Sequence, residues 1–227
     1  MALKRGKQTY LFQHPAAIQS FAAIGSKREG EGPLGEFFDT IDPDSTFGQK
    51  SWERAESRLH HDTVELAVKK AGLSYADLDC LLAGDLLNQC IGATFGVREL
   101  GIPYLGIYGA CSNMAEGLLL SAFLAESGLR YLGVSTASHF CTAERQYRFP
   151  LEYGGQRTPT SQWTVTGGGA VVVAGAAAQT PDQAGPWIQA AAIGTIEDKG
   201  IKDAANMGAA MAPAAAATIL GFLSDTG

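Results

Sequence analysis

The chain has 227 residues, of which 46% are hydrophobic and 18% are charged, and it contains 28 glycines. This length can bury a sizeable core, and the composition is typical of a packed α/β protein rather than a disordered one. The formal net charge is −6, and no cluster of Lys and Arg appears. Both features argue against a nucleic-acid-binding surface, because phosphate neutralisation needs basic side chains close together.

The cysteines and the start of the chain bear on metal binding and location. The four cysteines, at positions 80, 90, 111 and 141, form no CxxC pair and no close Cys/His set, so we expect no metal and no cofactor. Free thiols indicate a reducing compartment. The first twelve residues are partly basic but lack the apolar region of a signal peptide, and no run of 18 apolar residues exists. We therefore expect a soluble, intracellular protein.

Hydrophobic patterning predicts alternating strands and helices. Trp52, Ala55, Leu59 and Thr63 recur at helical spacing within Ser51–Ala71, with Ser51 as N-cap and Gly72 as the stop. A second helix, ending at Ser127, is apolar on every face, so we expect it to be covered on every face in the centre of a layered fold. Strands are expected at Gln8–Phe12, Ile18–Ile24, Leu78–Ala83, Tyr104–Tyr108, Tyr131–Thr136 and Thr164–Gly175.

The sequence after Pro186 echoes its own beginning. Ile188–Gly194 resembles Ile18–Gly25, and in both copies a connection leads to an apolar helix, at Ser51–Ala71 and at about Met207–Leu223. Short matches of this kind also arise by chance. If the echo is a true repeat, the second copy lacks its remaining strands and helices.

Several motifs spread over the chain resemble one family. They are Gly84–Gln89, Tyr108–Ser112, Ala137–Phe140, Thr142–Glu144, Tyr153–Gln156, Gln162–Gly167 and Asn206–Pro213. Together they resemble the stage V sporulation protein AD (SpoVAD) family. The resemblance implies an α/β protein with the duplicated thiolase-like fold, stacked in αβαβα layers. It also implies binding of pyridine-2,6-dicarboxylate (dipicolinic acid) during uptake into the developing spore.

The resemblance carries further expectations about partners and extent. It implies association with the other SpoVA membrane-complex proteins, and hence a peripheral position at the inner membrane of the forespore. Thiolase-like proteins also commonly form homodimers. Members of the family continue past the equivalent of Gly227. We therefore expect a complete first half at 1–180, with a loop insertion at 138–163, and the incomplete start of a second half at 187–227.

Cys111 is the main candidate for a ligand site. It lies where a predicted strand, Tyr104–Tyr108, meets a helix, and the unpaired N–H groups and helix dipole there favour negative charge and lower a thiol pKa. The position suits a nucleophile or a carboxylate ligand beside the thiol, and a buried, inert cysteine is the alternative. The ligand interpretation places the backbone N–H groups of Gly109, Ala110 and Ser112 around an anion.

Whether a histidine is available as a base bears on the choice between a binding function and a catalytic one. A thiolase-type acyl transfer needs an imidazole to accept the thiol proton and a second donor for the oxyanion. His60 and His61 lie on the amphipathic helix, where we expect them to be solvated, and His14 lies in an apparent turn. In thiolases the catalytic histidines come from the second half of the fold. We therefore expect no catalytic residue, and His139 remains as a candidate ligand-binding residue.

Four polar residues complete the candidate site. Asp85 and Asn88 follow the carboxyl end of a strand, where open α/β folds place ligands, although both residue types are also common helix caps. Arg145 and Arg148 could pair with carboxylates, or could be solvated loop residues. Aromatic side chains that could stack on a planar ring, or only pack the long loop, are Tyr147, Phe149, Tyr153 and Trp163.

Two other functions remain open from the sequence. Cys111 alone suggests an acyl-CoA-using enzyme of the thiolase or ketoacyl-synthase type. A structural remnant that serves only assembly is the third possibility.

Overall fold

A computed structural model describes residues 2–147, 164–180, 185–203 and 206–227, with only the backbone described at 144–147. One mixed sheet organises these residues. Its strands follow the spatial order β1-β2-β7-β6-β4-β5, and β3 and β8 also pair with β2. The strands are β1 (Leu3–Arg5), β2 (Thr9–Ser26), β3 (Thr40–Asp42), β4 (Cys80–Gly84), β5 (Tyr104–Gly106), β6 (Tyr131–Ser138), β7 (Gly167–Ala174) and β8 (Trp187–Ala192). The pairs β4–β5, β4–β6 and β2–β3 are parallel.

Strand β2 is one long strand, so the prediction of two separate strands is wrong. Its carboxyl-terminal part, from Ala17 to Gly25, pairs with β7, whereas Thr9–Leu11 and Ala16–Ala17 pair with β8. The pairing register shifts between Leu11 and Ala16, around Pro15, which lacks the N–H needed for a ladder hydrogen bond. Through this irregularity β2 passes from the main part of the sheet to β8.

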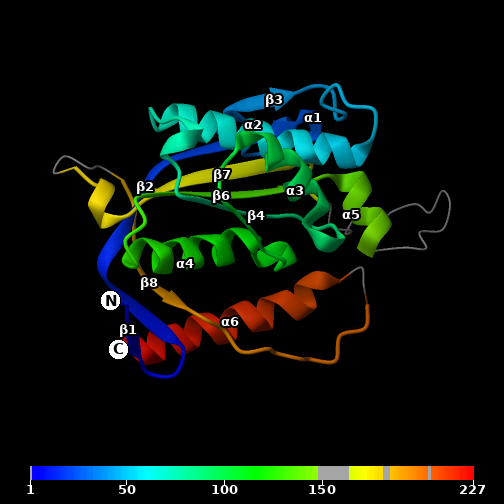
Figure 1. The fold of residues 1–227 in the computed structure, drawn as a ribbon. Coiled ribbons are helices and arrows are strands. Elements are labelled where there is room, and N and C mark those ends of the chain that lie inside the picture. The colour runs from blue at the N-terminus through cyan, green and yellow to red at the C-terminus, as the bar shows by residue number, and fades with distance from the viewer. Residues whose placement is uncertain (1, 148–163, 181–184, 204–205) are drawn as a thin grey trace.

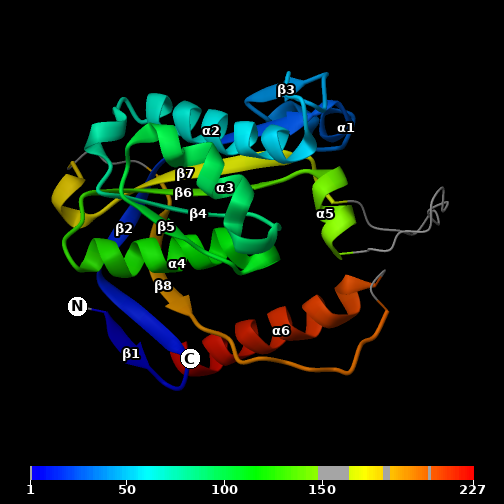
Figure 2. The ribbon, with the colours of Figure 1, turned by 45° about the vertical axis from the view of Figure 1, so that its right-hand side comes forward.

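The helices are α1 (Lys27–Gly30), α2 (Trp52–Lys70), α3 (Ile91–Val97), α4 (Asn113–Glu126), α5 (Phe140–Tyr147) and α6 (Met207–Thr226). Figures 1 and 2 show α2 and α3 covering one face of the sheet and α4 lying against the other. Beyond α4 lie β8 and then α6. The layers therefore alternate between helices and strands.

Helix α2 forms where the sequence predicts it, and more of its side chains are buried than the sequence analysis expected. The Ser51 hydroxyl accepts a hydrogen bond from the Arg54 N–H, which caps the helix. Its buried face consists of adjacent pairs at helical spacing: Ala55, Glu56, Leu59, His60, Thr63, Val64, Ala67 and Val68. The expectation that His60 is solvated is therefore wrong, since the side chain lies fully buried against β6.

Helix α4 is central but only partly covered. Gly128 has a positive φ of 108° and follows the helix end, as the stop signal predicts. Only Asn113, Gly117, Ser121, Ala122 and Ala125 are buried along the helix. The expectation of complete coverage is wrong for this chain, because the described elements cover one face of α4 well and leave most of its leucines half-buried.

Helices α5 and α6 bear on two expectations from the sequence, the loop insertion at 138–163 and the absence of a membrane-spanning segment. Helix α5 occupies the start of the expected loop at 138–163, and the rest of that loop, 148–163, lies outside the described residues. Helix α6 is long and apolar enough, by length and composition alone, to cross a membrane, and none of its 18-residue apolar window is buried. Its contacts instead join it to β2, to β8 and to the turn between β1 and β2 in the same folded unit.

Candidate functional site

The candidate site is built on an elbow, residues 109–112, between β5 and α4. Asn113, the buried first residue of α4, holds this elbow in place. Its Oδ1 accepts a hydrogen bond from the Gly109 N–H (2.6 Å), and its Nδ2 donates to the Asp85 carbonyl oxygen at the end of β4 (3.0 Å). One side chain therefore ties the elbow to the neighbouring strand.

The elbow itself is strained and presents the thiol outward. Ala110 has a φ of 50°, a left-handed conformation that is uncommon for residues other than glycine. Residues 110–112 form a short 3-10 turn, after which α4 begins. Cys111 is exposed on this turn, so the alternative of a buried, inert cysteine does not hold.

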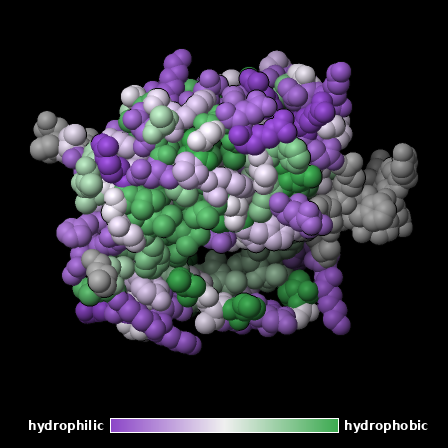
Figure 3. Space-filling view, in the orientation of Figure 1, coloured by the Kyte–Doolittle hydropathy of each residue, from purple (hydrophilic) through white to green (hydrophobic). Residues whose placement is uncertain are grey.

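Cys111 lines a cavity with two lobes, which we call the elbow cavity. The first lobe, of about 700 Å³, lies over the sheet, and the second, of about 550 Å³, extends toward the segment before α6. Both lobes share six lining residues: Leu86, Ala110, Cys111, Thr164, Met207 and Met211. Figure 3 shows the surface hollowed between the main body and the strip of chain that includes α6. Each lobe lies within the range of about 300–1,000 Å³ typical of small-molecule sites.

The floor of the first lobe consists of strand ends with few side chains. Gly84 closes β4, Ala137 lies near the end of β6, and Gly167–Gly169 begin β7. A Cβ at Gly84 would meet Asn113, and one at Gly167 would lie 2.8 Å from the Ile24 carbonyl oxygen. These glycines therefore permit close packing of the strand ends that line the first lobe.

Asp85 lines the first lobe, but its carboxylate is already engaged. It accepts hydrogen bonds from the N–H groups of Leu87 (2.7 Å) and Ala93 (2.6 Å), which fixes the start of α3. Burial raises the pKa of this carboxyl group, while these backbone hydrogen bonds lower it. The helix-capping interpretation of Asp85 describes what the structure shows.

Two of the three backbone donors expected around an anion are also engaged. The Gly109 N–H donates to Asn113, and the Ser112 N–H donates to the Gly109 carbonyl oxygen (3.0 Å). Gly109 and Ala110 line the elbow cavity, whereas Ser112 is not among its described lining residues. The expected ring of free N–H groups is therefore absent from the described part of the elbow.

Asn88 and His139 lie apart from the described lining of the elbow cavity. Asn88 is exposed, and its Oδ1 accepts a hydrogen bond from the Tyr108 hydroxyl (2.8 Å). His139 is buried, stacks on Trp52, and contacts the Ser45 carbonyl oxygen through Nε2 (2.9 Å). Burial lowers the pKa of His139, so the neutral ring is favoured. Its geometry is that of a structural residue.

The two arginines cannot be placed. Arg145 belongs to α5, but only its backbone is described, and Arg148 lies outside the described residues. Their role as carboxylate partners stays a prediction.

A buried polar cluster behind the cavity was missed by the sequence analysis. Glu56 is fully buried, and its Oε2 accepts a hydrogen bond from Thr142 (2.5 Å), while no partner is found for Oε1. Burial, together with the nearby charge of Asp85, raises the pKa of Glu56 to about 8. Gly92 lies between the two carboxyl groups. Glu56 precedes His60 by one helical turn, and the adjacent buried pairs of α2 were the available signal.

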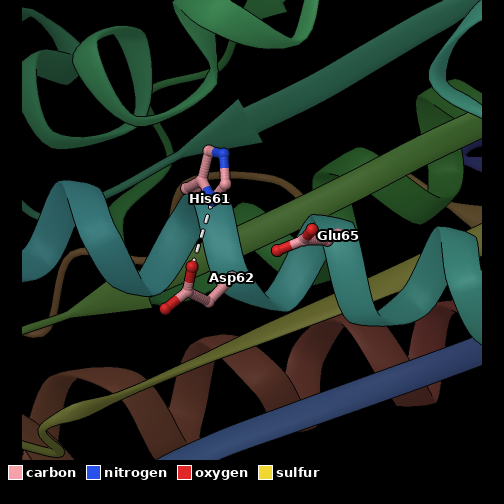
Figure 4. Close-up of side chains that lie close together, drawn as sticks. All are labelled: His61, Asp62 and Glu65. Atoms are coloured by element: carbon pink, nitrogen blue, oxygen red, sulfur yellow. Dashed lines mark hydrogen bonds and ion pairs between the residues drawn. The ribbon is translucent and has the colours of Figure 1, made fainter.

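A second group of polar side chains lies on the outer surface of α2. Figure 4 shows His61, Asp62 and Glu65, whose candidate ligand atoms lie within 4.8 Å of one another. Asp62 is already paired with Arg58 (2.7 Å), and Glu65 is exposed. The cation on Asp62 competes with any metal, so this group is a weaker candidate than the elbow cavity.

Comparison with known proteins identifies the family. Residues 6–227 match the profile of stage V sporulation protein AD (SpoVAD). The chain is 44% identical over 221 residues to stage V sporulation protein AD of Bacillus subtilis (strain 168), covering 97% of this chain and 64% of that protein. The chain belongs to the SpoVAD family. As a SpoVAD-family chain it is related to sporulation, and it spans less than two thirds of the length of this relative.

Solved structures show the fold of this SpoVAD-family chain. A variant of OleA from Xanthomonas campestris superposes with a TM-score of 0.50 at 16% identity, covering 74% of this chain and 57% of that one. The 3-oxoacyl-[acyl-carrier-protein] synthase III from Aquifex aeolicus gives 0.49 at 18% identity over 74% and 55% of the two chains. The predicted thiolase-like α/β fold is confirmed, and at these identities the likeness extends to the fold alone.

Proposed function

We propose that the chain binds a small aromatic dicarboxylate, dipicolinic acid, without catalysing a reaction. The observation that carries the proposal is the elbow cavity, with the exposed Cys111 at its wall and glycines of the strand ends among its lining residues. Dipicolinic acid is the ligand that the family resemblance implies. The cavity size is compatible with a planar ring of this kind.

The absence of an imidazole from the described lining supports binding over catalysis. Neither lobe has a histidine among its described lining residues. His60 and His139 are buried elsewhere: Nδ1 of His60 contacts the Ser135 hydroxyl while its Nε2 has no hydrogen-bond partner among the described residues, and both ring nitrogens of His139 contact backbone groups. A cysteine nucleophile of this fold class needs a base to accept its proton.

The test is isothermal calorimetry with dipicolinate on a chain extended to the length of its relative. We expect saturable binding, and Cys111→Trp should weaken it at least about 10-fold by filling the cavity wall. Cys141→Ala, a substitution of a thiol outside the described cavity lining, is the matched control and should leave binding unchanged. Absence of dipicolinate binding by the extended chain would refute the proposal.

An acyltransferase that uses Cys111 is the competing function. The exposed thiol on a strained elbow favours it, because such turns present nucleophiles. Incubation with acyl-CoA followed by mass spectrometry decides this point. An acyl group on Cys111, together with turnover that Cys111→Ala abolishes, would establish catalysis.

The proposal includes a place in a larger assembly. We propose association with the other SpoVA proteins at the inner membrane of the forespore, and self-association as a homodimer. In the described sheet β5 is an edge strand with Leu105 half-exposed, which supports an edge-mediated contact. Co-purification with membrane partners and the mass measured in solution test these two parts separately.

A further inference from the structure

Three methionines gather in the first lobe of the elbow cavity. The chain has four methionines, and every one except the initiator lines this lobe. Met114 comes from α4, whereas Met207 and Met211 come from the first two turns of α6. Flexible, polarisable thioethers make favourable contacts with aromatic rings.

One of the methionines packs over the glycines at the start of β7. Met114 Cε lies 3.8 Å from the position that a Cβ on Gly169 would take, so this thioether covers the start of β7. A space bounded by backbone on one side and by thioethers on the other accepts a flat ring better than a branched aliphatic group. The lining of glycines and thioethers therefore favours a planar aromatic ligand.

The described lining of the second lobe contains one basic and one acidic side chain, Lys202 and Asp203. Lys202 is the one basic residue among the described lining residues of the elbow cavity. It lies close to the start of α6, on the same side of the cavity as Met207 and Met211. An ammonium group there complements a negatively charged substituent on the ring.

Helix α6 is fastened at its far end. Asp225 accepts hydrogen bonds from the N–H groups of Lys7 (3.1 Å) and Gln8 (3.0 Å) and from the Thr9 hydroxyl (2.9 Å). The Gln8 side chain also donates to the Thr218 carbonyl oxygen (3.1 Å). These contacts hold the last three turns of α6 against the hairpin of β1 and β2.

The first two turns of α6 are separated from this anchor by Pro213. Proline has no N–H for the carbonyl oxygen of Ala209, which weakens the helix at that point and permits bending. No residue of α6 is buried, and its first turns face the elbow cavity. The first two turns of α6 are therefore the part of the helix that a ligand in the cavity could contact and fix.

We infer that Met207 and Met211 are ligand-contacting residues that, with Met114, clamp the flat ring of an aromatic carboxylate, and that the ligand fixes the first two turns of α6 against the body. This inference rests on the proposed function and deepens it. The clamp joins two layers of the fold through the ligand. Lys202 pairs with the carboxylate of the same ligand.

Methyl-labelled methionine NMR on the extended chain tests the contact directly. Substitution of single methionines by leucine assigns the resonances, and dipicolinate is added while calorimetry follows binding. We expect ring-current shifts at Met114, Met207 and Met211 and none at Met1. Met211→Ala should weaken binding by roughly 2- to 10-fold, the range expected for one thioether–ring contact. Leu220→Ala, an exposed α6 position outside the cavity lining, should not change it.

Hydrogen exchange tests the fixing of α6. Saturating dipicolinate should slow exchange of the amides of residues 207–212 in the wild type, and the Met207→Ala/Met211→Ala variant should lose this protection. Binding by calorimetry without methyl shifts or without protection overturns the inference and leaves the proposed function standing. If dipicolinate does not bind but benzoate or isophthalate shifts the three methyl groups, the proposed function fails and the clamp stands. No shift with any of these aromatic carboxylates overturns both.

Discussion

Helices α2 and α6 have similar lengths but differ in how many of their residues are buried. Helix α2 is rich in charged residues and buries eight of its residues against the sheet. Helix α6 has a single charged residue, Asp225, and buries none. Apolar composition therefore does not decide burial in this chain. The decisive factor is the surface each helix meets: three long strands for α2, and the edges of β2 and β8 for α6.

The largest expected difference in stability is between variants in which a leucine of each helix is shortened to alanine. Leu59→Ala in α2 leaves a cavity under a fully buried side chain and should destabilise the fold by about 2–5 kcal/mol. Leu220→Ala in α6, where the side chain is 65% exposed, should change the free energy of unfolding by less than about 0.5 kcal/mol. Urea denaturation of both variants measures the difference. Equal losses would show that α6 is as well covered as α2.

The buried acid of α2 should make stability depend on pH. The pKa of Glu56 is about 8 in the folded state against 4.5 for an ordinary glutamate, so the folded chain holds a proton that the unfolded chain loses. The free energy of unfolding should therefore fall as pH rises from about 4.5 to 8, by on the order of a few kcal/mol.

The Glu56→Gln variant removes this titration while keeping a hydrogen-bond acceptor for Thr142. Its stability relative to the wild type should increase steadily over the same pH range. Denaturation at several pH values provides the measurement, with the exposed Glu65→Gln of the same helix as control. A pH-independent difference would show that Glu56 does not titrate in this window.

A mid-sized effect is expected where the elbow is tied to β4. Asn113→Ala removes two hydrogen bonds and leaves the Gly109 N–H and the Asp85 carbonyl oxygen without this partner, at a cost of about 1–3 kcal/mol. Freed from β4, the elbow should also react faster with iodoacetamide at Cys111. Ser112→Ala, which removes an exposed hydroxyl from the same turn, is the control. If the alkylation rate and the stability of Asn113→Ala are unchanged, Asn113 does not hold the elbow against β4.

The smallest expected effects come from removing the capping side chains of the two helices. Ser51 and Asn206 each accept a hydrogen bond from a first-turn N–H at 3.3 Å. Ser51→Ala should lower the free energy of unfolding by about 0.5–2 kcal/mol, because α2 unfolds only with the whole fold. Asn206→Ala should instead speed hydrogen exchange of the first turn of α6 and leave the global midpoint nearly unchanged. A global loss from Asn206→Ala would show that both helices belong to one cooperative unit.

Parts of the site were predictable because they depend on neighbours in the sequence. The helix cap at Ser51, the helix end at Gly128 and the elbow at Cys111 follow from local residue preferences, and the structure contains all three. The two strands expected at the amino end were one, since pairing with β7 and β8 carries β2 past Pro15. Arg148 falls outside the described residues, so that prediction stays untested.

The sequence by itself determined the family, the order of most helices and strands, and the strand-to-helix junction at Cys111, because local periodicity and capping are short-range effects. The tertiary structure alone decided which polar groups are engaged. Glu56 meets Thr142 across 86 residues of sequence, and Asp85 is held by the amides of α3. It also placed Met207 and Met211 opposite Met114. Burial, pKa and cavity lining depend on surfaces that only the folded topology brings together.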